Sequence, residues 1–81
     1  IYIAPGNFHM KVVYTNEETR ISLDQNQLRN YVRPCADYLL ESASEIFGAH
    51  TLGIVLTGMG RDGADGAQAI KSSGGAVMIQ S

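Results

Sequence analysis

A glycine-rich turn carries the two aspartates of this chain that are best placed to do chemistry. The stretch LTGMGRDGADG, residues 56–66, contains four glycines together with Asp62 and Asp65, and it directly follows an apolar run. Such a run is typical of a strand buried in a parallel sheet. In open α/β sheets, ligands and catalytic groups collect beyond the carboxyl ends of these strands, where the next helix offers free N–H groups. The turn is therefore a candidate site for an acid that orients a reacting group.

Several kinds of site could use this turn. Gly58, Gly60 and Gly63 fit the G-x-G-x-x-G spacing of dinucleotide-binding turns, but an acidic residue is needed about twenty positions further on and none is found there. A calcium loop would need a third oxygen ligand and a closing glutamate, and a phosphate-binding loop would need Gly-Lys-Ser/Thr. Asp62 and Asp65 also suit helix N-caps, which accept hydrogen bonds from N–H groups two or three residues on. On residue chemistry alone, capping is the favoured interpretation.

The other nucleophiles and bases form no recognisable catalytic set. The G-x-S-x-G signature of a nucleophilic serine is absent, and His9 and His50 are expected to be loop or surface histidines. Cys35 could pair with one of them, but it falls on the apolar face of a predicted helix and is expected to be a buried core thiol. Arg33 is either a substrate clamp or a solvated residue. The chain thus offers one plausible catalytic acid, Asp62, and no partner for it.

The N-terminal third is predicted to form strands. Residues 1–3 and 9–15 are rich in β-branched and aromatic residues, and a Pro-Gly-Asn turn separates them. A polar turn and a further short strand at 19–23 follow, which predicts an antiparallel hairpin or meander. Residues 24–32 show no sustained period and are expected to form an irregular connection.

The remainder predicts helices that alternate with buried strands. A helix is expected over 34–47, because proline suits the first helical position and apolar residues then recur every three to four positions up to Gly48. Residues 52–57 and 76–80 lack polar alternation, which predicts strands buried on both faces, and residues 64–73 predict a helix between them. Strand, helix and strand make a βαβ unit, for which a right-handed crossover is expected.

Length, charge and cysteine content limit the class of protein. The chain has 81 residues, a net charge of −2 and no basic run, so no nucleic-acid partner is expected. No apolar stretch approaches the roughly twenty residues of a membrane span, so no membrane insertion is expected, and the single cysteine favours a reducing, cytoplasmic setting. The chain begins inside a predicted strand without a methionine and is interpreted as a fragment. Its incomplete sheet is expected to expose apolar surface and to self-associate.

Three segments together resemble one known family. IYIAPGNFHM, RPCAD and GIVLTGMGRDGADG are similar, in order and spacing, to the C-terminal half of the catalytic domain of CheB-type protein-glutamate methylesterases of bacterial chemotaxis. The turn LTGMG-x-DG-A is the most specific of the three. The resemblance covers nearly the whole chain and implies an α/β fold. In it, residues 1–81 are part of a doubly wound, mainly parallel sheet with an antiparallel hairpin at its N-terminal end.

The resemblance also implies an activity. In that family a Ser-His-Asp triad hydrolyses methyl esters on receptor glutamates and can deamidate receptor glutamines. The triad aspartate corresponds to Asp62, whereas the serine and the histidine lie upstream of the hairpin and outside this chain, so the fragment alone is predicted to be inactive. The backbone N–H of Met59 corresponds to a contributor to the oxyanion hole, and His9 takes no catalytic role. Cys35 and Val32 stand where many members have serine and a polar residue.

The implied partners are methyl-accepting chemotaxis receptors as substrate and a receiver domain elsewhere in the parent chain, with no metal and no cofactor. Two alternatives stay open: a dinucleotide-binding βαβ fragment of an oxidoreductase, and a non-catalytic interaction module with the same fold. Capping and catalysis are compatible roles for Asp62, because a carboxylate that a helix N-terminus keeps ionised can still accept the proton of an imidazole Nδ1.

Overall fold

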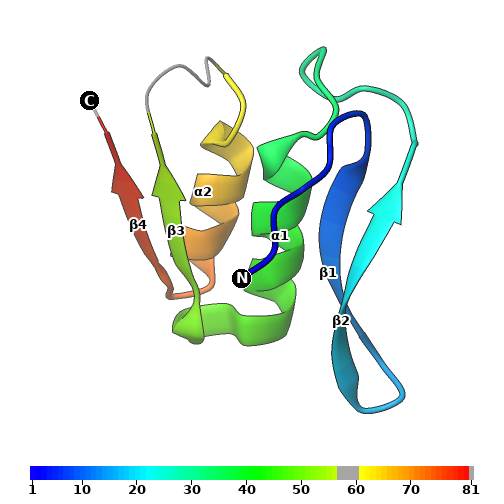
Figure 1. Cartoon of the computed structure of the whole chain (residues 1–81). Coiled ribbons are helices and arrows are strands. Elements are labelled where there is room, and N and C mark those ends of the chain that lie inside the picture. Colours follow the sequence, from blue (N-terminus) through cyan, green and yellow to red (C-terminus); the bar gives the residue numbers. More distant parts are fainter. Residues whose placement is uncertain (57–60, 81) are drawn as a thin grey trace.

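Two small sheets flank two helices in the described part of the chain, residues 1–56 and 61–80 of a computed structural model (Figure 1). The elements follow one another in the order β1 (His9–Thr15), β2 (Glu18–Asp24), α1 (Ala36–Phe47), a 3-10 turn (Gly48–His50), β3 (Leu52–Val55), α2 (Ala64–Ser72) and β4 (Ala76–Ile79). The hairpin packs on α1, α1 packs on α2, and α2 packs on the pair β3–β4. This arrangement confirms the predicted mixed α/β fold, with a hairpin followed by a parallel βαβ unit.

The hairpin pairs along its full length. β1 and β2 run antiparallel from the pair His9–Asp24 to the pair Thr15–Glu18. The two residues of the connecting turn, Asn16 and Glu17, both have positive φ, at 52° and 64°. Two-residue turns of this kind match the twist of the flanking strands, so the predicted polar turn is confirmed.

The strand predicted at residues 1–3 is wrong. These residues have no strand pairing in the structure, and Ile1, Tyr2 and Ile3 are largely exposed. Their alternating apolar pattern is suited to a sheet, but an extended segment becomes a strand only where another strand accepts its backbone hydrogen bonds. No described strand lies in that position.

The helix α1 begins two residues later than predicted. Pro34 lies outside the helix, and Cys35 takes the N-cap position with extended backbone angles, φ −107° and ψ 124°. The first N–H groups of the helix, those of Ala36 and Asp37, donate to the Asp62 carboxylate, and the N–H of the N-cap residue Cys35 donates to the His9 Nδ1. The predicted stop is confirmed, since Gly48 ends the helix with φ 52°.

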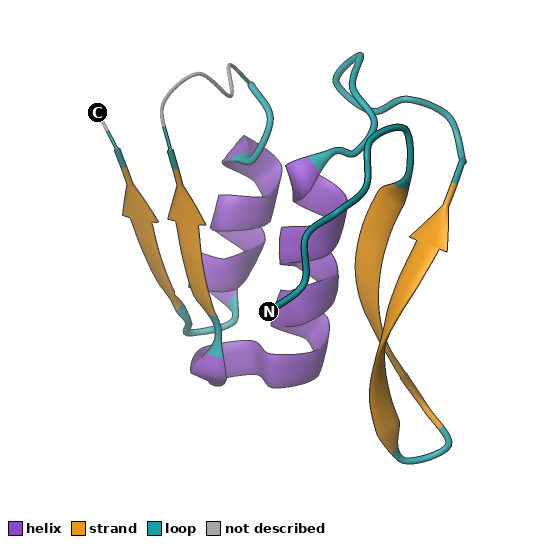
Figure 2. Cartoon of the chain, in the orientation of Figure 1, coloured by secondary structure: helices purple, strands orange, loops and turns teal. Residues whose placement is uncertain are grey.

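The parallel pair β3–β4 is buried on one face only, which corrects the expectation of burial on both. Gly53 is buried against α2, where an added Cβ would lie 2.6 Å from the Ile70 Cδ1. On the opposite face Ile54 and Met78 pair in register, and both remain exposed. In Figure 2 the helices lie on one side of these strands. Among the described residues nothing covers the other side.

None of the helices in the described part of the chain has the length and apolar character that a membrane crossing needs.

Candidate functional site

The Asp62 carboxylate caps the N-terminus of α1, a helix remote from it in sequence. Its Oδ2 accepts the Ala36 N–H at 2.8 Å, and its Oδ1 accepts the Asp37 N–H at 3.3 Å. The interpretation of Asp62 as the cap of its own helix is therefore wrong. That position is held by Gly63, which has φ 93°, and α2 has no side-chain cap. The two helix starts lie close together, so the aspartate reaches across to the neighbouring helix.

Asp62 is held in its charged form. Burial by itself raises the pKa of this carboxyl, yet the hydrogen bonds from the Ala36 amide and the Cys35 thiol outweigh burial, so that the pKa lies below its ordinary value. The positive end of the α1 dipole acts in the same direction. An aspartate that remains ionised near neutral pH is the state required of an acid that orients an imidazolium.

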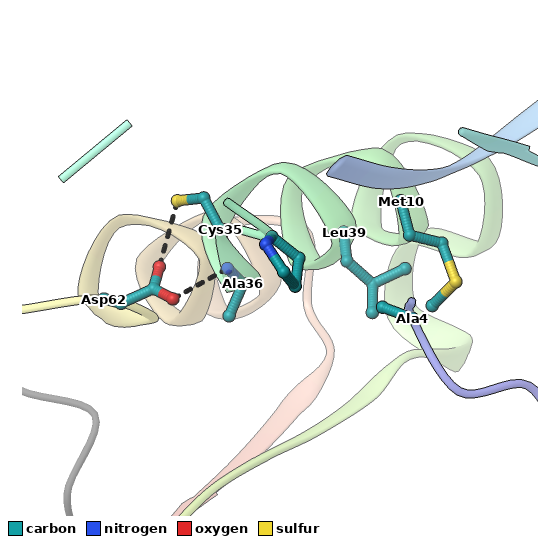
Figure 3. Close-up of a pocket in the computed structure, with 7 residues that line it drawn as sticks. Ala4, Met10, Cys35, Ala36, Leu39 and Asp62 are labelled. Atoms are coloured by element: carbon teal, nitrogen blue, oxygen red, sulfur yellow. Dashed lines mark hydrogen bonds between the residues drawn. The ribbon is translucent and has the colours of Figure 1, made fainter. Parts of the chain in front are cut away.

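Cys35 is buried, as predicted, but it also has a polar role that the sequence analysis missed. Only 1% of its surface is exposed, and its Sγ–H donates to the Asp62 Oδ1 at 3.0 Å (Figure 3). Burial, together with this hydrogen bond, raises the pKa of the thiol to about 11. Cys35 therefore stays protonated near neutral pH. It acts as a hydrogen-bond donor rather than as a thiolate nucleophile.

Asp37 is a second site residue that the sequence analysis missed. Its side chain is fully buried, accepts the Gly66 N–H at 2.7 Å and accepts a hydrogen bond from the Asn30 Nδ2 at 2.8 Å. The two helices thus exchange carboxylates: Asp62, just before α2, caps α1, and Asp37, in the first turn of α1, binds an amide of α2. The signals in the sequence were its place in the RPCAD segment of the resemblance, which assigned it no role, and an acidic residue in a first helical turn, which is common without such a contact.

Gly66 allows this close approach of the two helices. A Cβ at this position would lie 2.5 Å from the Leu40 Cβ and 3.2 Å from the Asp37 Cα. Real Cβ atoms essentially never come within 3.0 Å of another heavy atom, so a larger residue would push the helices apart. The lack of a side chain at Gly66 therefore lets α2 approach α1 closely, and this contributes to the placement of Asp62.

His9 is buried, which corrects its prediction as a loop or surface residue. Its Nδ1 accepts the Cys35 N–H at 3.1 Å, and its Nε2 lies 2.9 Å from the Gln27 carbonyl oxygen. These partners fix the neutral tautomer with the proton on Nε2. The ring also packs edge-on against Tyr38. His9 ties the hairpin to the start of α1 and makes no hydrogen bond to Asp62. His50, in contrast, is exposed at the far end of α1, as predicted.

Arg33 and Asp65 have structural partners. Arg33 donates to the Asn7 Oδ1 and to the backbone carbonyls of Gln25 and Asn26. It therefore fastens the turn before β1 to the connection after β2, and the description as a plain solvated residue is wrong. Asp65 lies in the first turn of α2 and pairs with the Arg29 Nη2 at 3.5 Å, so it is not an N-cap.

A small cavity adjoins Asp62. It has a volume of about 180 Å³ and is mostly apolar, and Asp62 is the single charged residue in its lining (Figure 3). The lining residues are Ala4, Met10, Pro34, Cys35, Ala36, Leu39 and Asp62. The carboxylate therefore lines a cavity that has room for a side chain or a substrate group. Met59, the predicted oxyanion contributor, lies outside the described residues.

The cluster at the two helix starts does not suit a metal ion. Potential ligand atoms of Cys35, Asp37 and Asp62 lie within 4.8 Å of one another. However, the two carboxylates already accept N–H groups, the thiol is protonated, and two helix N-termini place positive charge beside them. A cation would have to displace these donors. The cluster is better described as a pair of cross-linked helix caps.

These features define a class of site. An ionised aspartate in the turn that follows a parallel strand, anchored by backbone amides beside a cavity, is the arrangement expected of the acid in an α/β hydrolase of the Ser-His-Asp type. Among the hydrogen bonds of the described residues, none joins Asp62 to a serine or a histidine. Within the described residues, Asp62 is therefore anchored by helix amides and, among the side chains named as candidates, by the Cys35 thiol alone.

Comparison with known proteins identifies the family. The family described as CheB methylesterase matches residues 1–81, and the chain belongs to it. A protein-glutamate methylesterase/protein-glutamine glutaminase of Caulobacter vibrioides is 48% identical over 81 residues, and one of Pyrococcus abyssi is 43% identical over 79 residues. These alignments cover 99% and 98% of this chain but only 23% and 22% of the two relatives.

A solved structure agrees with the fold. The crystal structure of the Thermotoga maritima CheB methylesterase catalytic domain superposes with a TM-score of 0.88 at 43% identity, and covers 94% of this chain and 40% of the solved chain. The predicted resemblance is thereby confirmed. The match also favours the esterase hypothesis over the dinucleotide-binding alternative.

Proposed function

We propose that this chain is the C-terminal part of the catalytic domain of a protein-glutamate methylesterase, and that it supplies Asp62 as the acid of a Ser-His-Asp triad. The serine and the histidine come from a part of the protein outside residues 1–81. The substrate is a methyl ester of a glutamyl side chain on a methyl-accepting chemotaxis receptor, and receptor glutamine is a second substrate. The names of the relatives from Caulobacter and Pyrococcus support both reactions.

The observation that carries this proposal is the anchoring of Asp62. Its Oδ2 accepts the Ala36 N–H group, and each carboxylate oxygen can accept two hydrogen bonds. The imidazole is proposed to donate to the second acceptor position of Oδ2. The amides of α1 fix the orientation of the carboxylate, which lines the cavity.

In the proposed reaction, the serine hydroxyl attacks the ester carbonyl and the imidazole takes the hydroxyl proton. The Asp62 carboxylate accepts a hydrogen bond from the imidazole Nδ1, fixes the tautomer that can act as a base, and stabilises the imidazolium. The imidazolium then donates its proton to the departing methanol. Water repeats the sequence on the acyl-enzyme and releases the glutamate. The backbone N–H of Met59 is proposed to stabilise the oxyanion.

Asp62→Asn in the full-length protein tests the proposal. An amide has no charge and favours the wrong imidazole tautomer, so kcat for methanol release from methylated receptor should fall at least about a hundredfold, with KM nearly unchanged. Asp65→Asn is the matched control, because it makes the same change three residues on. Its kcat should stay within about threefold of the parent value. Full activity of Asp62→Asn would refute the assignment.

A further inference from the structure

The described donors to the Asp62 carboxylate are backbone amides and one side chain. The Ala36 and Asp37 amides belong to the start of α1, and any sequence that forms this helix provides them. The side-chain donor is the Cys35 Sγ–H, which lies 3.0 Å from Oδ1. Cys35 gives its own helix no side-chain cap, so this contact is separate from helix capping.

The direction of the thiol hydrogen is also set by its surroundings. The Asn30 Nδ2 donates to the Cys35 Sγ at 3.8 Å and to the Asp37 Oδ2 at 2.8 Å. The sulfur therefore receives a hydrogen bond on one side and gives its own to Asp62 on the other. Burial raises the pKa of the thiol to about 11, which keeps the proton on the sulfur near neutral pH.

The donors divide unequally between the two carboxylate oxygens. Oδ1 accepts from the Cys35 thiol and from the Asp37 amide, Oδ2 accepts from the Ala36 amide, and the Gly63 amide also donates to the carboxylate. Since each oxygen has two acceptor positions, the thiol and the Asp37 amide together fill Oδ1. Without the thiol, Oδ1 would have an open position, and the carboxylate would be freer to rotate about its Cβ–Cγ bond.

We propose that Cys35 is a positioning residue for Asp62, whose thiol occupies Oδ1 and leaves Oδ2 as the oxygen that receives the imidazole. This role rests on the proposed function of Asp62. The thiol touches neither the ester nor the imidazole and acts only through the carboxylate. A serine hydroxyl at this position would provide the same donor, whereas alanine and valine would not.

Three variants of Cys35 in the full-length protein test the role by initial-rate kinetics, with a melting curve for each. Cys35→Ala should lower kcat about tenfold, the equivalent of one net hydrogen bond, and leave KM within about twofold. Cys35→Val, which keeps an apolar side chain in the buried space, should show the same loss and carries the test if the alanine variant does not fold. Cys35→Ser should restore kcat to within about twofold of the parent.

Ser44→Ala is the matched control. It removes another buried donor of α1, one that binds only the Glu41 carbonyl, and it should leave kcat within about twofold. In an Asp62→Asn background, Cys35→Ala should cause no further loss, because the two residues act as a unit.

Two results separate the proposals. If Asp62→Asn is impaired while Cys35→Ala and Cys35→Val keep the parent kcat, the role of Cys35 is refuted and that of Asp62 stands. A Cys35→Ser variant as slow as Cys35→Ala refutes it too, since the donor is then not the cause. If Asp62→Asn is fully active, both proposals fail together.

Discussion

The junction of α1 and α2 and the open face of β3–β4 differ in which kind of side chain is buried and which is exposed. At the junction, charged and polar groups are buried, and every buried side-chain nitrogen and oxygen of the described residues has a hydrogen-bond partner. On the sheet face, large apolar side chains lie exposed, with Ile54 at 57% and Met78 at 61%. The groups that hold the acid are thus complete within this chain, whereas the apolar face that should lie under another layer is not covered.

The difference shows which part of a site a fragment can keep. A cap requires only two helix starts and their carboxylates, all of which lie between residues 35 and 66. Covering a sheet face requires a whole further layer of structure, because sheets bury their apolar faces against other elements. We therefore expect the two regions to respond to different changes.

The largest effect is expected at the junction. Asp37→Ala in the full catalytic domain removes the acceptor of the Gly66 N–H and of the Asn30 amide, both in a buried place. Leaving these donors unpaired should lower the free energy of unfolding by about 3 kcal/mol, measured by urea denaturation. Glu45→Ala, at an exposed position of the same helix, should stay within about 0.5 kcal/mol. Equal stability of the two variants would show that the exchange of carboxylates does not stabilise the fold.

A smaller effect is expected on the sheet face of the isolated chain. The chain should self-associate through its exposed apolar side chains, and Ile54→Glu should weaken that association at least about tenfold in dissociation constant, because it places a charge in the contact. Sedimentation velocity over a concentration series measures the change. Gln68→Glu alters the net charge equally on the exposed side of α2 and should have little effect. A parent chain that is monomeric at high concentration would contradict the expectation.

A third effect is a dependence of stability on alkaline pH. The folded state raises the pKa of the Cys35 thiol from 9.0 to about 11, so the unfolded chain loses this proton first. The contribution of the protonated thiol to stability is therefore complete below about pH 9 and is lost as the pH rises toward 11. Cys35→Ser should lack this component, since its hydroxyl does not ionise in that range. Parallel stability curves for the two proteins between pH 8 and 11 would rule the effect out.

Local signals predicted most of the elements. The β-branched and aromatic residues and the turn residues between them predicted the hairpin. The regular spacing of apolar residues, followed by a glycine, predicted α1 to within two residues at its start. Such patterns are set by neighbours in the sequence and need no knowledge of the rest of the fold. Asp62 was identified through family resemblance, because its residue type alone favoured a cap.

The remainder depended on contacts between distant residues. The burial of His9 depends on Gln27 and on the backbone of Cys35, 18 and 26 residues away. Cys35 was predicted to be buried, but as part of a helix face rather than as the N-cap residue with a donor to Asp62. Asp37 gave no specific signal, because its amide partner is in the next helix. Polar groups of this kind acquire their roles only when elements pack together.

The hydrogen bonds of Asp62 also bear on the order in which the protein folds. Those to the start of α1 span 25 to 27 residues, so no local segment can form them. During synthesis, the start of α1 is made before Asp62 exists, and its first amides must stay hydrated until the later segment arrives. Docking of α2 then brings the acid and closes the start of α1 in one event. Folding of this region and the anchoring of the Asp62 carboxylate are therefore the same step.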